Sequence, residues 1–378
     1  MKFSAEKNIL AEAVINASKA CAVKTAFSAL DGVLLSLRGN RLTVTGYDLE
    51  TGIRVNINAE GETDGDIIVE ARLFSDIIRK MPENSNITVE VKEKNKVSVN
   101  YGKIKLNIQG TSGESFPNII ELNRNISFKI KEKELKNILS QISHAVAKND
   151  VNPTLRGAKF DIEDNMLYII ATDAMRLALR KMPLQYDDIG FIVPDKAVTE
   201  LIRNMSDGDG DVDIVIDRNQ SCFSKENYTI FSRLLDGKYV DYKKLTESKT
   251  IRELTVNTRE FTDSLERSLL FINERFKNPV ICEIDNEDSC MRLSCVTGLG
   301  EFNEEIGIMK ARILDDGAGN ADNKIFRMAF NPRFMIDVLK NSNCDEVRME
   351  FVSELAPIKI TPLDGDDVLF VVVPVRIK

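Results

Sequence analysis

The sequence predicts an α+β fold that is repeated three times along the chain. Three short segments with alternating apolar and polar residues open the copies, at Phe3–Ala5, Phe128–Ile130 and Leu254–Val256. Each is followed by a polar turn and by apolar residues at helical spacing. A chain of 378 residues has the length of two or three domains, and these regular intervals favour three.

Each copy is expected to contain the same elements in the same order. The first helix carries an apolar stripe at i, i+4 and i+7, formed by Leu10, Val14 and Ala17, by Leu135, Leu139 and Ile142, and by Phe261, Leu265 and Ser268. A strand follows at 42–46, 167–171 and 293–297, and a second helix at 72–80, 196–204 and 333–341. Alternating segments such as 87–91 and 347–351 then indicate antiparallel strands with one solvated face.

Polar linkers separate the copies at 110–125 and 236–250. We therefore predict domains at residues 1–120, 126–247 and 251–378. The second helix of the third copy starts later than the repeat requires, and the loop around 315–322 is expected to hold the inserted residues.

Composition excludes several classes of protein. No apolar run approaches the roughly 18 to 20 residues that span a bilayer, and the N-terminus has no apolar signal-peptide stretch, so we expect a cytoplasmic chain. The six cysteines lack metal-ligand spacing and are expected to be buried thiols. His144, the only histidine, is expected on a helix surface. No metal, cofactor or catalytic residue is predicted.

Three motifs have plain structural interpretations. Asp207–Asp211 alternates Asp and Gly like a calcium loop, but it lacks the later glycine and glutamate of that motif and is interpreted as a turn. Gly298–Gly300 lacks the third glycine of a dinucleotide-binding loop. Asp48 and Asp173 occupy the same repeat position, and we expect them to cap turns rather than to act as acid and base.

Basic residues recur at both ends of the second helices. They are Arg72 and Arg79, Lys196 and Arg203, and Arg333 and Lys340. Seven residues is about two helical turns, so each pair lies on one face. A solvated surface explains any single pair, whereas three matching pairs in a chain of net charge −8 favour a surface that meets a polyanion.

The motifs, taken in order, resemble the bacterial β sliding clamps, the processivity subunits of the replicative DNA polymerase. The likeness rests on 1–3, 48–50, 116–118, 171–173 with 176–178, 236–237 with 241–242, and 372–377. It implies three tandem copies of a DNA-clamp fold, each with two helices packed on antiparallel sheets. It further implies a ring-forming, head-to-tail homodimer that encircles double-stranded DNA without sequence preference, and no enzymatic activity.

The resemblance also implies binding sites. The loops after the first helices add Lys24, Lys148, Asn149 and Arg275 to the six helix cations as DNA contacts. The dimer interface is expected at Leu106 and Ile108 of one chain and Leu270 and Phe271 of the other.

The alternative function for the chain is a triplicated α+β enzyme that uses the aligned cations to hold a phosphorylated substrate.

A partner-peptide pocket is implied between the second and third domains. It is expected to bind short motifs of the polymerase catalytic subunit, the clamp loader and other clamp-binding proteins. Its residues are Leu155, Thr172, Ala174, Met175, Arg176, Leu177, Val240, Lys244, Leu245, Val373, Pro374, Val375 and Arg376. Ala174, Met175, Val240 and Lys244 depart from the family pattern, which leaves the preferred motif open.

Overall fold

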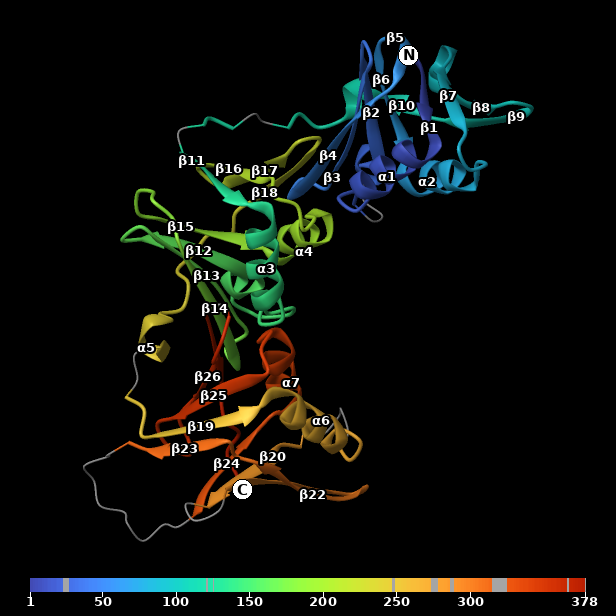
Figure 1. Cartoon of the computed structure of the whole chain (residues 1–378). Helices are drawn as coiled ribbons and strands as arrows, with labels where there is room; N and C mark the ends of the chain where they lie inside the picture. The colour runs from blue at the N-terminus through green and yellow to red at the C-terminus, as the bar shows by residue number, and fades with distance from the viewer. Residues whose placement is uncertain are drawn as a thin grey trace. The chain divides into compact units, whose positions relative to one another are not determined.

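The computed structural model describes residues 1–22, 27–119, 122–124, 126–246, 249–272, 278–285, 289–314, 325–365 and 367–377. The chain divides into two compact units (Figure 1). Unit 1 comprises residues 1–136 and 196–234, and unit 2 comprises residues 137–195 and 235–378. Each unit is built around one nine-stranded antiparallel sheet and one smaller sheet.

The sheets of unit 1 join strands from distant parts of the chain. The nine-stranded sheet has the order β10 (Thr111–Ser112), β6 (Gly65–Glu70), β2 (Gly32–Arg38), β3 (Arg41–Tyr47), β4 (Thr51–Asn58), β18 (Tyr228–Arg233), β17 (Gln220–Lys225), β16 (Asp211–Asp217) and β11 (Ile126–Lys131). The second sheet has the order β5 (Glu60–Thr63), β1 (Lys2–Glu6), β7 (Asn86–Val91), β8 (Lys96–Tyr101) and β9 (Ile104–Gln109). Strand β9 therefore forms one edge of the five-stranded sheet.

The sheets of unit 2 follow the same plan. The nine-stranded sheet has the order β15 (Ile189–Pro194), β12 (Gly157–Glu163), β13 (Met166–Thr172), β14 (Arg176–Pro183), β27 (Val368–Val372), β26 (Ile358–Pro362), β25 (Glu346–Phe351), β19 (Arg252–Asn257) and β23 (Lys310–Ile313). The four-stranded sheet has the order β22 (Gly300–Gly307), β21 (Cys290–Thr297), β20 (Val280–Asp285) and β24 (Ile325–Phe330). Strand β22 is an edge strand.

The helices confirm the threefold repeat. The first helices are α1 (Lys7–Ser18), α3 (Glu132–Ser143) and α6 (Thr258–Ser268), and the second helices are α2 (Ala71–Lys80), α4 (Asp195–Asn204) and α7 (Pro332–Asn341). Helix α1 packs against α2, and α6 against α7. All nine residues of the predicted apolar stripes are buried without exposed surface. A short helix in the second linker, α5 (Lys243–Thr246), was not expected, and the loop predicted at 315–322 lies outside the described residues.

The expectation for His144 was wrong. Helix α3 ends at Ser143, and the His144 ring packs against the ring of Phe370 in β27 with centroids 5.7 Å apart. Burial is the main cause that lowers the pKa of His144 to about 4, so the imidazole is a neutral packing group at neutral pH. Its place just beyond the apolar stripe explains why it points inward.

The cysteines fit the expectation only in part. Cys21, Cys282 and Cys295 are buried, whereas Cys222, Cys290 and Cys344 are half-buried. Asp207 and Asp209 lie in the loop between α4 and β16, as the turn interpretation predicted. The longest helices in the described ranges have 12 residues, and none combines the length and apolar character needed to cross a membrane.

Candidate partner-binding site and nucleic-acid interface

The expected peptide site lies in unit 2, where β14 pairs with β27. Arg176 is paired with Val372 and Leu177 with Val371, so the chain's last strand completes this part of the sheet. Leu155 and Leu177 belong to one buried apolar cluster with Val371, and Val240 packs against it. These predicted residues come from three distant segments, and the fold places them together.

The turn before β14 holds two predicted residues at the surface. The Asp173 carboxylate accepts the backbone N–H groups of Met175 (3.0 Å) and Arg176 (2.9 Å), and Thr172 Oγ1 donates to the Arg176 carbonyl (2.7 Å). Ala174 adopts φ of 68°, a region that favours glycine. The Met175 side chain is 51% exposed. The turn therefore presents a flexible thioether to solvent beside the terminal strand, as expected for an adaptable contact.

Arg176 is held in place by neighbours that the sequence did not reveal. Its Nε donates to Asp173 at 3.0 Å, its Nη1 pairs with Asp337 of α7, and its guanidinium lies 4.6 Å from the centroid of the Phe334 ring. The side chain is only 13% exposed. Asp337 is 161 residues away in the sequence, so no local spacing pointed to it.

The remaining residues of the expected pocket come from the linker and the C-terminal segment. Val373 donates its N–H to the Met175 carbonyl (2.9 Å), and Val375 donates to the Ala329 carbonyl (2.7 Å). Pairing within β27 stops before Pro374, which has no N–H to donate. Leu245, Lys244, Val375 and Arg376 are exposed. The terminal segment is thus anchored by its backbone while its side chains face solvent.

Two tyrosines of the second linker belong to the same site and were missed. Tyr239 and Tyr242 are buried in the cluster that holds Leu155 and Leu177. The Tyr242 hydroxyl donates to Asp161 (3.0 Å), and the Tyr239 hydroxyl to the Ile170 carbonyl (3.3 Å). Tyr242 was part of the recognised linker motif, so the signal to include it was present.

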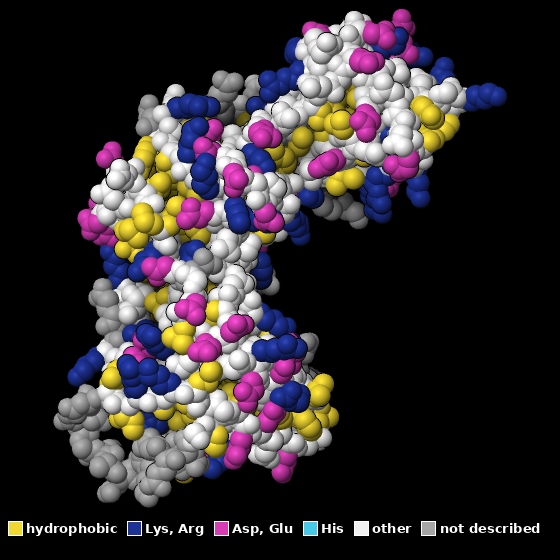
Figure 2. Space-filling view, viewed as in Figure 1, with side chains coloured by type: hydrophobic (Ala, Val, Ile, Leu, Met, Phe, Trp, Pro, Cys, Tyr) yellow, Lys and Arg dark blue, Asp and Glu magenta, His cyan; other side chains and the backbone are white. Residues whose placement is uncertain are grey.

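The aligned cations occupy equivalent positions in the three second helices. Arg72, Lys196 and Arg333 are the second residues of α2, α4 and α7, and Arg79, Arg203 and Lys340 the ninth. Within the described part of the chain, carboxylates pair with at least four of them: Arg79–Asp76 (3.7 Å), Lys196–Asp48, Arg203–Glu200 (2.7 Å) and Lys340–Glu266 (2.6 Å). Basic and acidic side chains are likewise intermingled on the face shown in Figure 2. A polyanion that approached these helices would have to compete with the carboxylates for the paired cations.

The loop residues are only partly described. Lys148 binds both carboxylate oxygens of Asp195 at 2.8 Å, and Asn149 is exposed. Lys24 and Arg275 lie outside the described residues.

The expected dimer residues lie at two sheet edges. In unit 1, Leu106 on edge strand β9 is exposed and Ile108 is half-buried. In unit 2, Leu270 is 77% exposed, and the Phe271 ring contacts that of Phe302 on edge strand β22, with centroids 6.4 Å apart. Each unit therefore has an unpaired edge strand with apolar side chains beside it.

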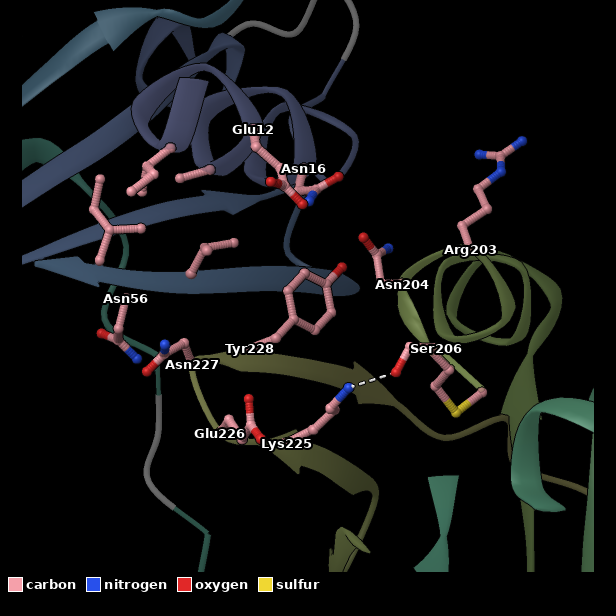
Figure 3. Close-up of a pocket in the computed structure, with 15 residues that line it drawn as sticks. Glu12, Asn16, Asn56, Arg203, Asn204, Ser206, Lys225, Glu226, Asn227 and Tyr228 are labelled. Carbon is pink, nitrogen blue, oxygen red and sulfur yellow. Dashed lines mark hydrogen bonds between the residues drawn. The ribbon is translucent and has the colours of Figure 1, made fainter. Parts of the chain in front are cut away.

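Unit 1 contains a cavity of 520 Å³, which is the kind of place where an enzyme would bind a phosphorylated substrate (Figure 3). It lies among α1, β4, the end of α4 and the β17–β18 turn, and Asn16, Asn204 and Tyr228 are among the residues that line it. Both cations that line it are neutralised: Lys225 binds Glu132 at 2.6 Å, and Arg203 binds Glu200. Burial acts to raise the pKa of Glu132, but hydrogen bonds from Lys225 and Ser206 outweigh it and lower the pKa. Lys225 and Ser206 bind one oxygen of this carboxylate, Oε1, and hold the group in its ionised form, so it is not a poised general acid.

No group of three or more His, Cys, Asp or Glu side chains in the described parts of the chain is placed to hold a metal ion. Three copies of a two-helix module on antiparallel sheets, with cations at matching helix positions, define instead the architecture of a DNA clamp.

Comparison with known proteins shows the family to which the chain belongs. Family models of the DNA polymerase III beta subunit match its N-terminal domain at residues 1–120, its central domain at 129–241 and its C-terminal domain at 246–376. The Beta sliding clamps of Staphylococcus epidermidis and Bacillus subtilis are each 29% identical to this chain over its whole length, and the alignments cover 99% and 100% of those proteins.

Solved structures agree with the sequence matches. The DNA polymerase sliding clamp from Bacillus subtilis has a TM-score of 0.93 at 28% identity, and a protein from Eubacterium rectale assigned as a DNA polymerase III beta subunit has 0.91 at 30%. Both alignments cover 100% of both chains. The chain therefore belongs to the family of bacterial DNA polymerase III beta subunits, the beta sliding clamps. Proteins of this family are processivity factors, and the chain is not an enzyme.

Proposed function

We propose that this chain forms a homodimeric ring that encircles duplex DNA and tethers the replicative polymerase and other partners for processive synthesis. The proposal includes domains at 1–120, 126–247 and 251–378 and a cytoplasmic location. It rests above all on the way the chain distributes its strands among four sheets.

Each nine-stranded sheet is a union of two groups of strands that belong to neighbouring domains. In unit 1, β4 of the first domain pairs with β18 of the second, and in unit 2, β14 of the second pairs with β27 of the third. The four-stranded and five-stranded sheets end in β22 of the third domain and β9 of the first. Together they would make a third nine-stranded sheet, and a head-to-tail pair of chains supplies it twice. Such pairing also removes two exposed edges that otherwise favour aggregation.

The repeat fixes the expected register of that pairing. Val44 pairs with Val55 in the first domain as Cys295 pairs with Phe302 in the third, so Phe302 occupies the place of Val55. Phe223 pairs with Ile230 as Val99 pairs with Leu106. Since Thr229 faces Arg54 across the unit 1 junction, Lys105 of one chain is expected to face Glu301 of the other. Opposite charges at facing positions support this register.

A charge swap tests the ring. Lys105→Glu and Glu301→Lys each place like charges across the interface and should shift the chain toward monomer, whereas the double variant should recover the dimer. Leu270→Ala with Phe271→Ala should also weaken the dimer, because each side chain contributes roughly 1.5 to 3 kcal/mol of apolar burial. Sedimentation velocity measures the mass of each variant. Dimers that stay unchanged in the two single charge variants and in the double alanine variant would contradict the proposed interface.

For DNA, we propose that Arg72, Arg79, Lys148, Asn149, Lys196, Arg203, Arg333 and Lys340, together with Lys24 and Arg275, face the phosphates. The matching helix positions support this proposal, as does the surface exposure of Arg72, Arg79, Lys148, Arg203, Arg333 and Lys340. Retention on circular DNA after loading should fall when several are changed to Glu, with dimerisation unaffected. Retention equal to that of the parent would argue against the assignment.

For partners, we propose that the residues around the β14–β27 junction bind short motifs of the polymerase catalytic subunit and the clamp loader. Support comes from the packing of Leu155, Leu177 and Val240 in one cluster and from the exposed side chains of Met175 and Val375 beside it. Burial of two apolar side chains of the peptide favours binding, and the loss of conformational freedom on ordering the peptide opposes it. The balance corresponds to a dissociation constant on the order of micromolar. Removal of residues 375–378 should abolish binding of a Gln-Leu-x-Leu-Phe peptide in titration calorimetry while the ring still assembles.

A further inference from the structure

A second cavity in unit 1 lies on the opposite face of the sheet from that in Figure 3. Its volume is 340 Å³, and its wall consists of Arg54, Ile119, Leu122, Arg124, Val215, Cys222, Ser224, Thr229 and Phe231. Successive residues of a strand point to opposite faces, so Arg54 and Thr229 line this cavity while Val55 and Tyr228 line the other. The linker that leads into β11 contributes Ile119, Leu122 and Arg124 (Figure 1).

This cavity lies at the position in unit 1 that is equivalent, by the repeat, to the proposed partner-peptide site in unit 2. Tyr228 pairs with Val55 and Ser232 with Thr51, and in unit 2 Val368 pairs with Arg180 and Val372 with Arg176 in the same register. Arg54, Thr229 and Phe231 therefore correspond to Leu179, Leu369 and Val371. The unit 2 residues pack into an apolar cluster that linker residues Tyr239 and Tyr242 fill. In unit 1 the corresponding place is the cavity, which Ile119, Leu122 and Arg124 of the linker line.

The chemistry of the unit 1 cavity differs from that of its counterpart. Arg54 lies 5.8 Å from the centroid of the Phe231 ring, and this ring occupies space that only a glycine at position 52 leaves, since a Cβ there would collide with it. Burial raises the pKa of Cys222, and a hydrogen bond with Ser224 and the charges of Arg54 and Arg124 oppose the rise, which places both guanidinium charges near the thiol. Asp213, on the neighbouring strand, is paired with Lys129 at 3.4 Å.

Within the described residues, neither Arg54 nor Arg124 lies within ion-pair distance of a carboxylate. The cavity of Figure 3 is different, because Lys225 and Arg203 there are each matched by a glutamate. One half-buried and one exposed guanidinium group, of Arg54 and Arg124, beside an aromatic ring and aliphatic side chains suit a ligand that combines a carboxylate with an apolar group.

We propose that this cavity is a second peptide-docking site, for a short partner segment in which an acidic side chain adjoins a leucine or an aromatic residue. The carboxylate binds between Arg54 and Arg124, and the apolar side chain packs on Phe231, Leu122 and Val215. A volume of 340 Å³ lies at the lower end of the range for ligand pockets and suits about two side chains. The comparison with the unit 2 site rests on the proposed function, whereas the cavity and its charges do not.

Fluorescence anisotropy of a dye-labelled Ser-Asp-Leu-Phe-Asp-Ser peptide tests the proposal on the full-length chain. Its affinity should exceed that of the matched Ser-Asn-Leu-Phe-Asn-Ser peptide by about tenfold and should fall with salt. The double variant Arg54→Leu with Arg124→Gln should lower the affinity for the acidic peptide by roughly ten- to a hundredfold. Arg54→Lys should retain part of the affinity, and Lys129→Gln, on the same sheet but outside the cavity, should change it by less than about twofold.

The chain without residues 375–378 separates the two peptide sites. Binding of the acidic peptide that survives this deletion and is lost in the arginine double variant supports the new site, even if the unit 2 site proves to be placed wrongly. Binding that the double variant retains, or that only the deletion removes, overturns it. Thermal melting and sedimentation of the double variant, expected to match the parent, show that folding and dimerisation are intact.

Discussion

The chain has two strand pairs between domains, β4 with β18 in unit 1 and β14 with β27 in unit 2, which we call its two joints. Their backbone pairing has the same register, but different side-chain interactions stabilise them. At both, an aspartate caps the preceding turn: Asp48 accepts the N–H groups of Glu50 (2.9 Å) and Thr51 (2.6 Å), as Asp173 does for Met175 and Arg176. In unit 1 the cation on that aspartate is Lys196, from a helix of the next domain. In unit 2 it is Arg176, the first residue of β14 after the turn, which also pairs with Asp337.

The difference shows that two copies of the same strand pairing can carry different side-chain environments. The shared register makes both joints continuous sheet, so neither needs a particular side chain to form. The side chains are therefore available for other roles. In unit 2 a largely buried arginine, two linker tyrosines and the C-terminal segment surround the strand pair, whereas in unit 1 the corresponding face has a charged cavity.

The largest expected difference between the joints concerns their aromatic residues. Phe370 of β27 is fully buried, and Phe370→Ala should lower the free energy of unfolding by about 3–5 kcal/mol. Phe231 of β18 is half-buried beside a cavity, so Phe231→Ala should cost only about 1–2 kcal/mol. Urea denaturation at one fixed protomer concentration gives both values. Equal costs would mean that the unit 1 joint is packed as tightly as the other.

Acid should weaken unit 2 through a group that unit 1 lacks. The pKa of His144 is lowered to about 4 from an ordinary value of 6.5, so the folded state favours neutral imidazole. Its stabilising contribution is complete above pH 6.5 and declines as the pH falls toward 4, by up to about 3 kcal/mol. His144→Phe should remove this decline and keep the contact with Phe370. Unfolding curves between pH 7 and 4 measure it, and parallel pH profiles of parent and variant would exclude His144 as the cause.

The sequence predicted what is periodic and local. The apolar stripes of α1, α3 and α6 were correct because a buried helix face must repeat at helical spacing, and the capping roles of Asp48 and Asp173 were correct because they depend on three adjacent residues. The Arg176–Asp337 pair and the stacking of Arg176 on Phe334 were not predictable, since strand pairing between domains brings them together. His144 was misplaced for the same reason: its partner Phe370 lies far along the chain.

The smallest expected effect separates the two ion pairs. Arg176 is largely buried and has an aromatic ring and two carboxylates around it, whereas Lys196 is 40% exposed and solvent screens its pair with Asp48. A double-mutant cycle of Arg176→Ala with Asp337→Ala should therefore give a coupling energy of roughly 1–2 kcal/mol, and the cycle of Lys196→Ala with Asp48→Ala about 0.2–1 kcal/mol. The second cycle should lose most of its coupling at about 1 M salt, where charges further apart than about 3 Å are screened, and the first should keep most of it. Chemical denaturation of all the variants at two salt concentrations measures both cycles. If the Lys196–Asp48 pair had the larger coupling energy and kept it at high salt, the ion pair in unit 1 rather than that in unit 2 would contribute more to stability.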